Sequence, residues 1–126
     1  MGFGLPAAIG AAFAQTGDAR QIVLLCGDGG FQMSMQELAT LRRSPLPVKL
    51  FLFDNHALQM IEKMQDARYG GRRTASSLSD NPDFEAIGGA YGIPCRRLGV
   101  QDRAHLREAI STILASRESM LIHCIC

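Results

Sequence analysis

An unbroken apolar run that ends in a glycine-rich acidic turn constrains the fold more than any other part of the chain. Residues 21–26 contain four consecutive aliphatic side chains, without the alternation of a strand that has one exposed face. Such a run predicts a strand buried on both faces, as in a parallel sheet. The residues that follow, Gly27-Asp28-Gly29-Gly30, put a carboxylate between glycines at the carboxyl end of that strand.

The rest of the chain alternates between helical and strand-like segments. Apolar spacing predicts helices over residues 5–14, 31–43 and 58–64, and strands over residues 48–53, 95–98 and 120–125. Two further helices are expected, one capped by Asn81-Pro82 and closed by Gly92, the other capped by Asp102. Residues 16–20 should form a turn, and residues 65–80 a long polar loop. This order predicts a single α/β domain over residues 1–126, with a doubly wound parallel sheet.

Composition excludes several classes of function. No apolar run approaches the length of a membrane span, although 47% of the 126 residues are hydrophobic. A net charge of +1 gives no electrostatic case for binding nucleic acid or a membrane surface. The four cysteines, Cys26, Cys95, Cys124 and Cys126, lie mostly in strand-like segments and resemble the reduced thiols of a cytoplasmic protein.

Polar side chains follow two of the expected strands. Asp28 follows the first, and Asn55 follows the next one 27 positions later. If the strands are neighbours, a carboxylate and an amide oxygen meet at the carboxyl rim of the sheet, where doubly wound folds bind ligands at a switch point. These oxygens suit Mg²⁺, which usually completes its shell with water and phosphate oxygens.

The two glycines after Asp28 strengthen the case for an anionic ligand. Without a Cβ, Gly29 and Gly30 let phosphate oxygens approach backbone N–H groups at the start of the helix expected over residues 31–43. The pattern predicts a diphosphate held through a divalent metal. The alternative is that Asp28 only caps its helix and that Asn55 only forms a turn.

At these residues the chain resembles the cofactor-binding domain of the thiamine-diphosphate-dependent enzymes, whose signature is GDG followed at a comparable distance by an Asn-Asn-like pair. Within them it is most similar to the acetolactate synthase catalytic (large) subunit. The resemblance covers essentially the whole chain and rests on the segments MGFGLPAAIGA (1–11), GDGGFQM (27–33), QELAT (36–40), PVK (47–49) and NPDF (81–84).

The resemblance implies thiamine diphosphate and Mg²⁺ as cofactors. It implies that the metal is ligated by the side chains of Asp28 and Asn55 and by the backbone carbonyl of Ala57. Cofactor contacts are implied for Met1, which would hold the cofactor in its bent shape, and for Gly29, Gly30, Asn55, Leu58, Gln59 and Met60. The implied reaction is decarboxylation of a 2-keto acid such as pyruvate and carboligation to a second keto acid, as in branched-chain amino acid biosynthesis.

The sequence departs from the family pattern at Asp54, Gln59 and Met64, where an asparagine, a glycine and an acceptor-site tryptophan are usual. The glutamate that activates the cofactor in the family belongs to another domain, usually in a partner subunit. We therefore expect no catalytic residue in this chain. We expect it to be either a domain fragment of a longer, homo-oligomeric enzyme or a truncated gene product, in both cases inactive on its own.

Three other interpretations of the chain stay open, together with one of a single residue, His56. The chain could belong to another thiamine-dependent 2-keto acid decarboxylase or carboligase, or serve as a non-catalytic interaction module. The segment Gly2–Ala7 fits a dinucleotide-binding G-x-G-x-x-A pattern, but no strand precedes it. His56 could contact a phosphate or be a solvated loop residue.

Overall fold

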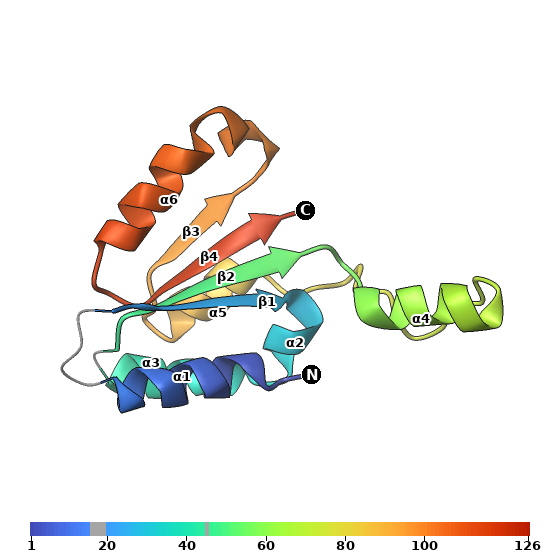
Figure 1. Ribbon diagram of the computed structural model, residues 1–126, viewed down its shortest axis with the longest axis horizontal. Coiled ribbons are helices and arrows are strands. Elements are labelled where there is room, and N and C mark those ends of the chain that lie inside the picture. The colour runs from blue at the N-terminus through green and yellow to red at the C-terminus, as the bar shows by residue number, and fades with distance from the viewer. Residues whose placement is uncertain (16–19, 45) are drawn as a thin grey trace.

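The structure, a computed structural model, describes residues 1–15, 20–44 and 46–126. Four strands form one parallel sheet in the order β1-β2-β4-β3 (Figure 1). They are β1 (Ile22–Gly27), β2 (Val48–Asp54), β3 (Cys95–Leu98) and β4 (Met120–Ile125). The predicted α/β class, parallel sheet and strand positions are confirmed.

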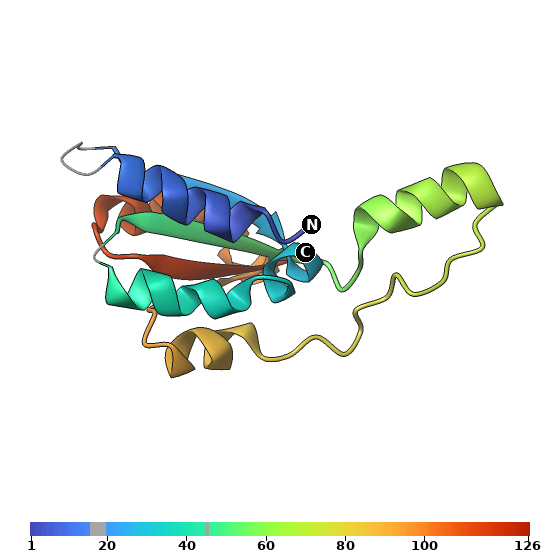
Figure 2. The ribbon, with the colours of Figure 1, turned by 90° about the horizontal axis from the view of Figure 1, so that it is seen from below.

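Helices cover both faces of the sheet. One face carries α1 (Gly4–Ala14), α2 (Asp28–Gln32), α3 (Leu38–Arg43) and α5 (Phe84–Ala90), and the other carries α6 (Leu106–Ala115) (Figures 1 and 2). Two 3-10 turns, η1 (Met35–Glu37) and η2 (Val100–His105), precede α3 and α6. In the described part of the chain, no helix is long and apolar enough to cross a membrane.

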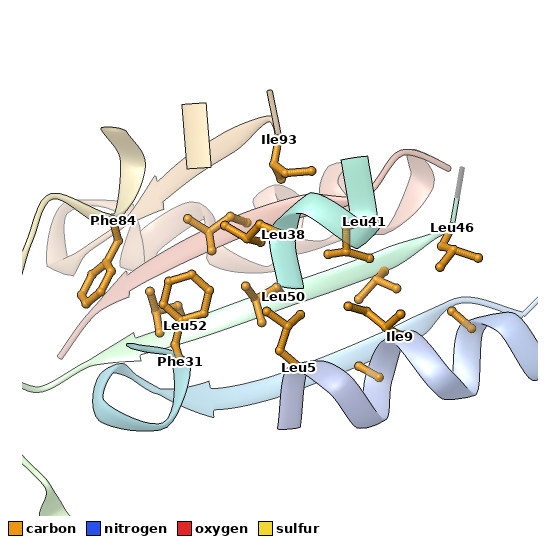
Figure 3. Packing of buried hydrophobic residues seen from close by; sticks show 14 residues of the cluster. Leu5, Ile9, Phe31, Leu38, Leu41, Leu46, Leu50, Leu52, Phe84 and Ile93 are labelled. Carbon is orange, nitrogen blue, oxygen red and sulfur yellow. The ribbon is translucent and has the colours of Figure 1, made fainter. Parts of the chain in front are cut away.

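The larger core lies between the sheet and α1, α3 and α5 (Figure 3). Alternate residues of β2 divide between the two faces: Leu50 and Leu52 join this core, whereas Phe51 packs with Ile113 of α6 and Ile122 of β4. The pleat therefore gives β2 two buried faces, as the four consecutive apolar residues at 50–53 predict.

The prediction that β1 is buried on both faces is wrong for this chain. Its residues alternate in exposure, and Val23 and Leu25 are 48% and 66% exposed. β1 is the edge strand beside β2, and among the described residues the hydrophobic cluster under α6 is formed with β2, β3 and β4. The apolar run thus reflects a strand with one face covered by α1 and one face uncovered.

The helix predicted over residues 31–43 is also broken. α2 begins earlier, at Asp28, and stops at Gln32, because Ser34 leaves the helical region with φ −142° and ψ 17°. The N–H of Ser34 then bonds to the carbonyl of Phe31, and the N–H of Glu37 to that of Ser34, which are the tighter bonds of a 3-10 turn. The apolar residues still share one face, so spacing alone could not reveal the interruption.

Two predicted caps are displaced. The side chain of Asp83, not Asn81, caps α5, accepting from the N–H groups of Glu85 and Ala86. Asp102 accepts from the N–H of Gly99 at 2.8 Å and so caps η2, while α6 begins only at Leu106. The closure of α5 by Gly92 is confirmed, since its φ of +70° suits glycine. The predicted turn at residues 16–20 falls mainly outside the described residues.

The helix predicted at residues 58–64 is present but longer. α4 (Gln59–Tyr69) extends beyond the carboxyl edge of the sheet, and the chain returns along it as far as α5 (Figure 2). Arg73 ties the return segment to the helix, since its guanidinium pairs with Asp66 at 2.7 Å and with Glu62 at 3.1 Å. The predicted loop over residues 65–80 therefore includes the last turn and a half of this helix.

Candidate functional site

A pocket of about 320 Å³ opens at the carboxyl ends of β1 and β2. The two strands pair in parallel, with Gly27 opposite Phe53, so the residues that follow them come together. The pocket is lined by all nine residues singled out from the sequence, Met1, Asp28, Gly29, Gly30, Asn55, Ala57, Leu58, Gln59 and Met60, together with Gly27, Phe53 and Ile61.

The carboxylate of Asp28 is held at the base of this pocket. The residue is 1% exposed, its Oδ1 accepts the N–H of Gly29 at 2.8 Å, and its Oδ2 accepts from Nδ2 of Asn81 at 2.8 Å. Because a carboxylate oxygen can accept more than one bond, each oxygen keeps a lone pair for a further partner.

The turn after β2 shapes the opposite wall. Oδ1 of Asn55 accepts the N–H of Ala57 at 3.2 Å, and Oδ1 of Asp54 accepts the N–H of His56 at 3.3 Å. His56 has a φ of +55°, in the left-handed region. Asn55 therefore does form a turn, as the alternative interpretation proposes. Its amide oxygen can still accept a second bond, and the residue also lines the pocket.

The two glycines differ in what surrounds them. A Cβ on Gly29 would come within 2.2 Å of Cδ2 of Leu58, so α2 and the segment after β2 approach each other closely here. A Cβ on Gly30 would meet nothing within 4 Å. Close packing against Leu58 thus explains why position 29 requires a glycine, whereas position 30 lies beside open space at the pocket.

Two expectations about this rim need correction. α2 is only five residues long, so the dipole of a long helix does not act on the pocket, although the N–H groups of its first turn have no intrahelical acceptor. In addition, α3 and α5 lie on the same face of the sheet, so the rim between β1 and β2 is not a topological switch point within this chain.

A buried polar network adjoins the pocket. Nδ2 of Asn81 also donates to Oδ1 of Asp54 at 2.8 Å, and Oδ2 of Asp54 lies 3.0 Å from Nε2 of His123. On the other side of the imidazole, Nδ1 lies 3.0 Å from Oε1 of Glu85. Asp54 and His123 are 3% and 6% exposed, so both side chains are removed from solvent.

The electrostatics of this network are governed by its hydrogen bonds. Burial acts to raise the pKa of Asp54, but its hydrogen bonds with His123, Asn81, Asp28 and the backbone N–H of His56 together outweigh burial, and the pKa lies below its ordinary value. At the first strand end, burial and the nearby charge of Asp28 raise the pKa of the Cys26 thiol to about 12. Cys26 is therefore a neutral thiol beside the site.

Sequence reasoning missed most of this network. The sequence predicts a helix cap at Asn81 and only a departure from a motif at Asp54, and it places His123 in the strand expected over residues 120–125 without a role of its own. A histidine within the otherwise apolar run of β4 was the available signal, because a buried imidazole needs polar partners. His56, in contrast, is exposed, and its Nδ1 lies 3.5 Å from Asp54 on the side away from the pocket.

Comparison with known proteins decides the family. The sequence profile described as "Thiamine pyrophosphate enzyme, C-terminal TPP binding domain" matches residues 1–124. The chain belongs to this family. The resemblance inferred from the glycine-rich turn and its surroundings is thereby confirmed, and so is the function class of a thiamine diphosphate-binding domain.

Individual members of the family support the same placement. The chain is 40% identical to the acetolactate synthase isozyme 2 large subunit of Escherichia coli (strain K12), with 98% of the chain and 22% of that protein covered. It is 43% identical to the chloroplastic acetolactate synthase of Arabidopsis thaliana, with 100% and 19% covered. It is 37% identical to the probable acetolactate synthase large subunit of Methanocaldococcus jannaschii, with 97% and 20% covered. The chain thus spans about a fifth of the length of these curated relatives.

The pocket fits the diphosphate of the family's cofactor in two respects. The open space at Gly30 allows an anion to approach the backbone of the first turn of α2, where N–H groups lack intrahelical acceptors. Asp28 and Asn55 bring a carboxylate and an amide oxygen to the same pocket, which are the donors that a hard cation prefers.

Proposed function

We propose that the pocket between β1 and β2 binds thiamine diphosphate through Mg²⁺. The observation that carries this proposal is the meeting, in one pocket, of the Asp28 carboxylate, the Asn55 amide and the two glycines with Met1. Helix capping by Asp28 and turn formation by Asn55 explain less of the site, since these roles use only part of the hydrogen-bonding capacity of the two side chains.

In this proposal the metal is ligated by the side chains of Asp28 and Asn55 and by the carbonyl of Ala57. Among the described residues no three His, Cys, Asp or Glu side chains are grouped to hold a metal, so the remaining ligands would be diphosphate oxygens and water. The metal and the diphosphate therefore depend on each other for binding.

The other pocket residues hold the organic part of the cofactor and its diphosphate. Gly29, Gly30 and the backbone of Leu58, Gln59 and Met60 surround the diphosphate position. Met1 and Met60 expose 70% and 78% of their surface, which offers apolar contact to a ring system. Burial of these side chains against the cofactor would also exclude water from it.

When bound, thiamine diphosphate supplies a thiazolium ring that accepts the electron pair released as a 2-keto acid loses CO₂. Asp28 is the one acidic side chain among the described residues that line the pocket, and as a metal ligand it cannot also activate the cofactor. We therefore propose that the activating carboxylate lies outside residues 1–126, and that these residues alone do not turn over pyruvate.

The reaction proposed for the whole enzyme is that of its relatives: decarboxylation of pyruvate and carboligation to a second 2-keto acid in a homo-oligomer. The names of the relatives favour this reaction over another thiamine-dependent decarboxylation or an interaction module. Met64, on α4, stands where the family usually has an acceptor-site tryptophan. The choice of acceptor is therefore the part of the reaction in which this chain should differ.

Titration calorimetry of the 126-residue chain with thiamine diphosphate tests the proposal. Binding should require Mg²⁺, disappear with EDTA, and weaken at least tenfold in Asp28→Asn, which keeps the shape of the side chain but removes its charge. Asp83→Asn is the matched control, since asparagine caps a helix as well as aspartate does and Asp83 lies outside the pocket.

Two results would count against the proposal. Binding that is indifferent to EDTA would remove the metal from it. Unchanged affinity in Asp28→Asn would leave Asp28 with only its structural bonds. Pyruvate turnover by the chain alone would contradict the separate proposal of an external activating group.

A further inference from the structure

The side chain of Asn81 lies between two buried carboxylates. Its Nδ2 is 2.8 Å from Oδ2 of Asp28 and 2.8 Å from Oδ1 of Asp54, which follow β1 and end β2, respectively. The amide nitrogen carries two hydrogens, so it donates one to each carboxylate and has none left. Asn81 therefore connects the proposed metal ligand to a second carboxylate that does not line the pocket.

A third residue fixes which end of the amide faces the carboxylates. Nε2 of Gln32 donates to Oδ1 of Asn81 at 2.8 Å. An amide turned by half a rotation would direct its oxygen at both carboxylates and its nitrogen at another donor. Gln32 thus holds Asn81 in the orientation in which it donates to Asp28.

The second carboxylate, that of Asp54, has a further hydrogen-bond partner on the side away from Asn81. Oδ2 of Asp54 lies 3.0 Å from the His123 ring, whose other nitrogen lies 3.0 Å from Glu85. Asp54 can thus accept from Asn81 with one oxygen and from His123 with the other. The network reaches the surface where Nε of Arg97 lies 3.7 Å from Glu85.

We propose that Asn81 is a positioning residue for the metal site: by bridging Asp28 to Asp54 it holds the Asp28 carboxylate with one lone pair of each oxygen directed to the pocket. This inference rests on the proposed function, since it assigns Asn81 a role only if Asp28 binds the metal. The N–H of Gly29 fixes Oδ1, and Asn81 fixes Oδ2. Without Asn81, two buried carboxylates would face each other with no donor between them.

A purely structural role for Asn81 is the alternative to be separated. Asn81 lies in the segment between α4 and α5, and its three side-chain bonds could serve only to tie that segment to the sheet. A structural role requires the bonds that Asn81 itself makes, so no other residue could replace it. A positioning role requires only a hydrogen-bond donor beside Oδ2 of Asp28, and another residue could supply that donor.

Asp54→Asn provides that donor from the other side. An asparagine at position 54 can accept from His123 with its oxygen and direct its amide hydrogens at Asp28. We therefore expect Asn81→Ala to weaken the binding of thiamine diphosphate with Mn²⁺ by about 10- to 100-fold, the usual effect of removing a partner of a metal ligand. Asn81→Ala combined with Asp54→Asn should recover most of that loss.

The test is made on the 126-residue chain, with calorimetry for affinity and the paramagnetic resonance spectrum of bound Mn²⁺ for the ligand geometry. The spectrum should change in Asn81→Ala and return to that of the wild type in the double variant. Circular dichroism melts show whether each variant folds. If Asn81→Ala does not fold, Gln32→Ala replaces it, because it frees the amide to rotate and should also weaken binding several-fold.

The outcomes separate this inference from the proposed function. Absence of any Mn²⁺-dependent binding by the wild-type chain would overturn both. Normal wild-type binding with unchanged affinity in Asn81→Ala, or in Gln32→Ala where that variant replaces it, would overturn the positioning role alone. A loss in Asn81→Ala that Asp54→Asn does not recover would also overturn it, in favour of the structural role.

Discussion

Nε2 of His123 lies 3.0 Å from Oδ2 of Asp54, and the two residues belong to adjacent parallel strands. Both side chains are buried, and the His123 ring also packs edge-on against Phe84, with ring centroids 5.5 Å apart. The contact lets the carboxylate that ends β2 remain charged inside the protein, because its hydrogen bonds compensate for lost hydration. It also makes the stability of the sheet depend on pH.

His123→Leu should therefore lower the free energy of unfolding by about 2 kcal/mol at pH 7, since it removes a hydrogen bond to a buried charge. The pKa of Asp54 is lower in the folded chain than its ordinary value of 3.8. Its contribution is thus fully present above the ordinary value and is lost as the pH falls through the folded value. Urea unfolding between pH 2.5 and pH 7 should show a shallower acid loss in the variant.

His105→Leu is the control for this comparison. His105 is exposed and makes no capping bond with its side chain, so its replacement should change stability by less than about 0.5 kcal/mol. Equal acid slopes in wild type and His123→Leu would show that Asp54 is not the group that His123 stabilises.

The contrast between β1 and β2 shows how much of the fold could be predicted from sequence. Both contain four consecutive apolar residues, and both were correctly predicted as parallel strands, since such runs seldom occur outside a covered sheet. Which of them has two buried faces depends on its place in the sheet order, and that order is decided by contacts far apart in the sequence. Leu25 is therefore 66% exposed although its neighbours look like core residues.

The candidate site could likewise be predicted only in part from the sequence. Asp28 and Asn55 could be paired from sequence because each follows a strand, and the strands turned out to be neighbours. Asn81 could not, because it reaches the site from a segment that first runs along α4 (Figure 2). The residues around Asn81 predict a helix N-terminus, where asparagine is common. Nothing in that segment indicates that its side chain contacts two carboxylates from distant strands.

The cysteines should react in an order set by exposure and pKa. Cys126 is exposed, although burial also raises its pKa, whereas Cys26 and Cys124 are half-buried and their pKa values are raised to about 12 and about 11. Because the thiolate is the reactive form, iodoacetamide at pH 8 should label Cys126 first and Cys26 last. Peptide mass spectrometry over a time course measures this order, and labelling in urea should abolish it. Equal rates for Cys26 and Cys126 in the native chain would contradict the partial burial and raised pKa of Cys26.

Lys49 is a buried cation at the opposite end of β2 from the pocket. It is fully buried and its Nζ donates to the carbonyl of Glu118; burial lowers its pKa, and the Glu118 charge only partly opposes this. The unfolded chain therefore binds the Lys49 proton more tightly, which costs stability at neutral pH. Lys49→Met should raise the free energy of unfolding by about 1 kcal/mol at pH 7.

The gain from Lys49→Met should shrink as the pH rises toward 10.5, the ordinary pKa of lysine. Urea unfolding of both chains at pH 7, 8 and 9.5 measures this trend. Cofactor affinity should not change, since Lys49 does not line the pocket. A variant that is less stable at every pH would show that the bond to Glu118 outweighs the cost of burying the charge.

Gly29 and Gly30 offer a matched pair of alanine substitutions with different expected results. At Gly29 a methyl group would come within 2.2 Å of Cδ2 of Leu58 and 3.1 Å of Cδ1 of Leu78, so both side chains must shift and stability should fall by about 1 kcal/mol. At Gly30 nothing lies within 4 Å, and alanine in a helix should instead add about 0.5 kcal/mol. Thermal unfolding measures both changes.

The same pair separates stability from cofactor binding. If the space at Gly30 holds the diphosphate, Gly30→Ala should bind thiamine diphosphate with Mg²⁺ at least tenfold more weakly although the chain itself is more stable. Gly29→Ala should weaken binding only as far as it displaces Leu58 from the pocket wall. Calorimetry on the two folded variants measures this difference. Wild-type affinity in Gly30→Ala would mean that the open space beside the first turn of α2 is not where the anion lies.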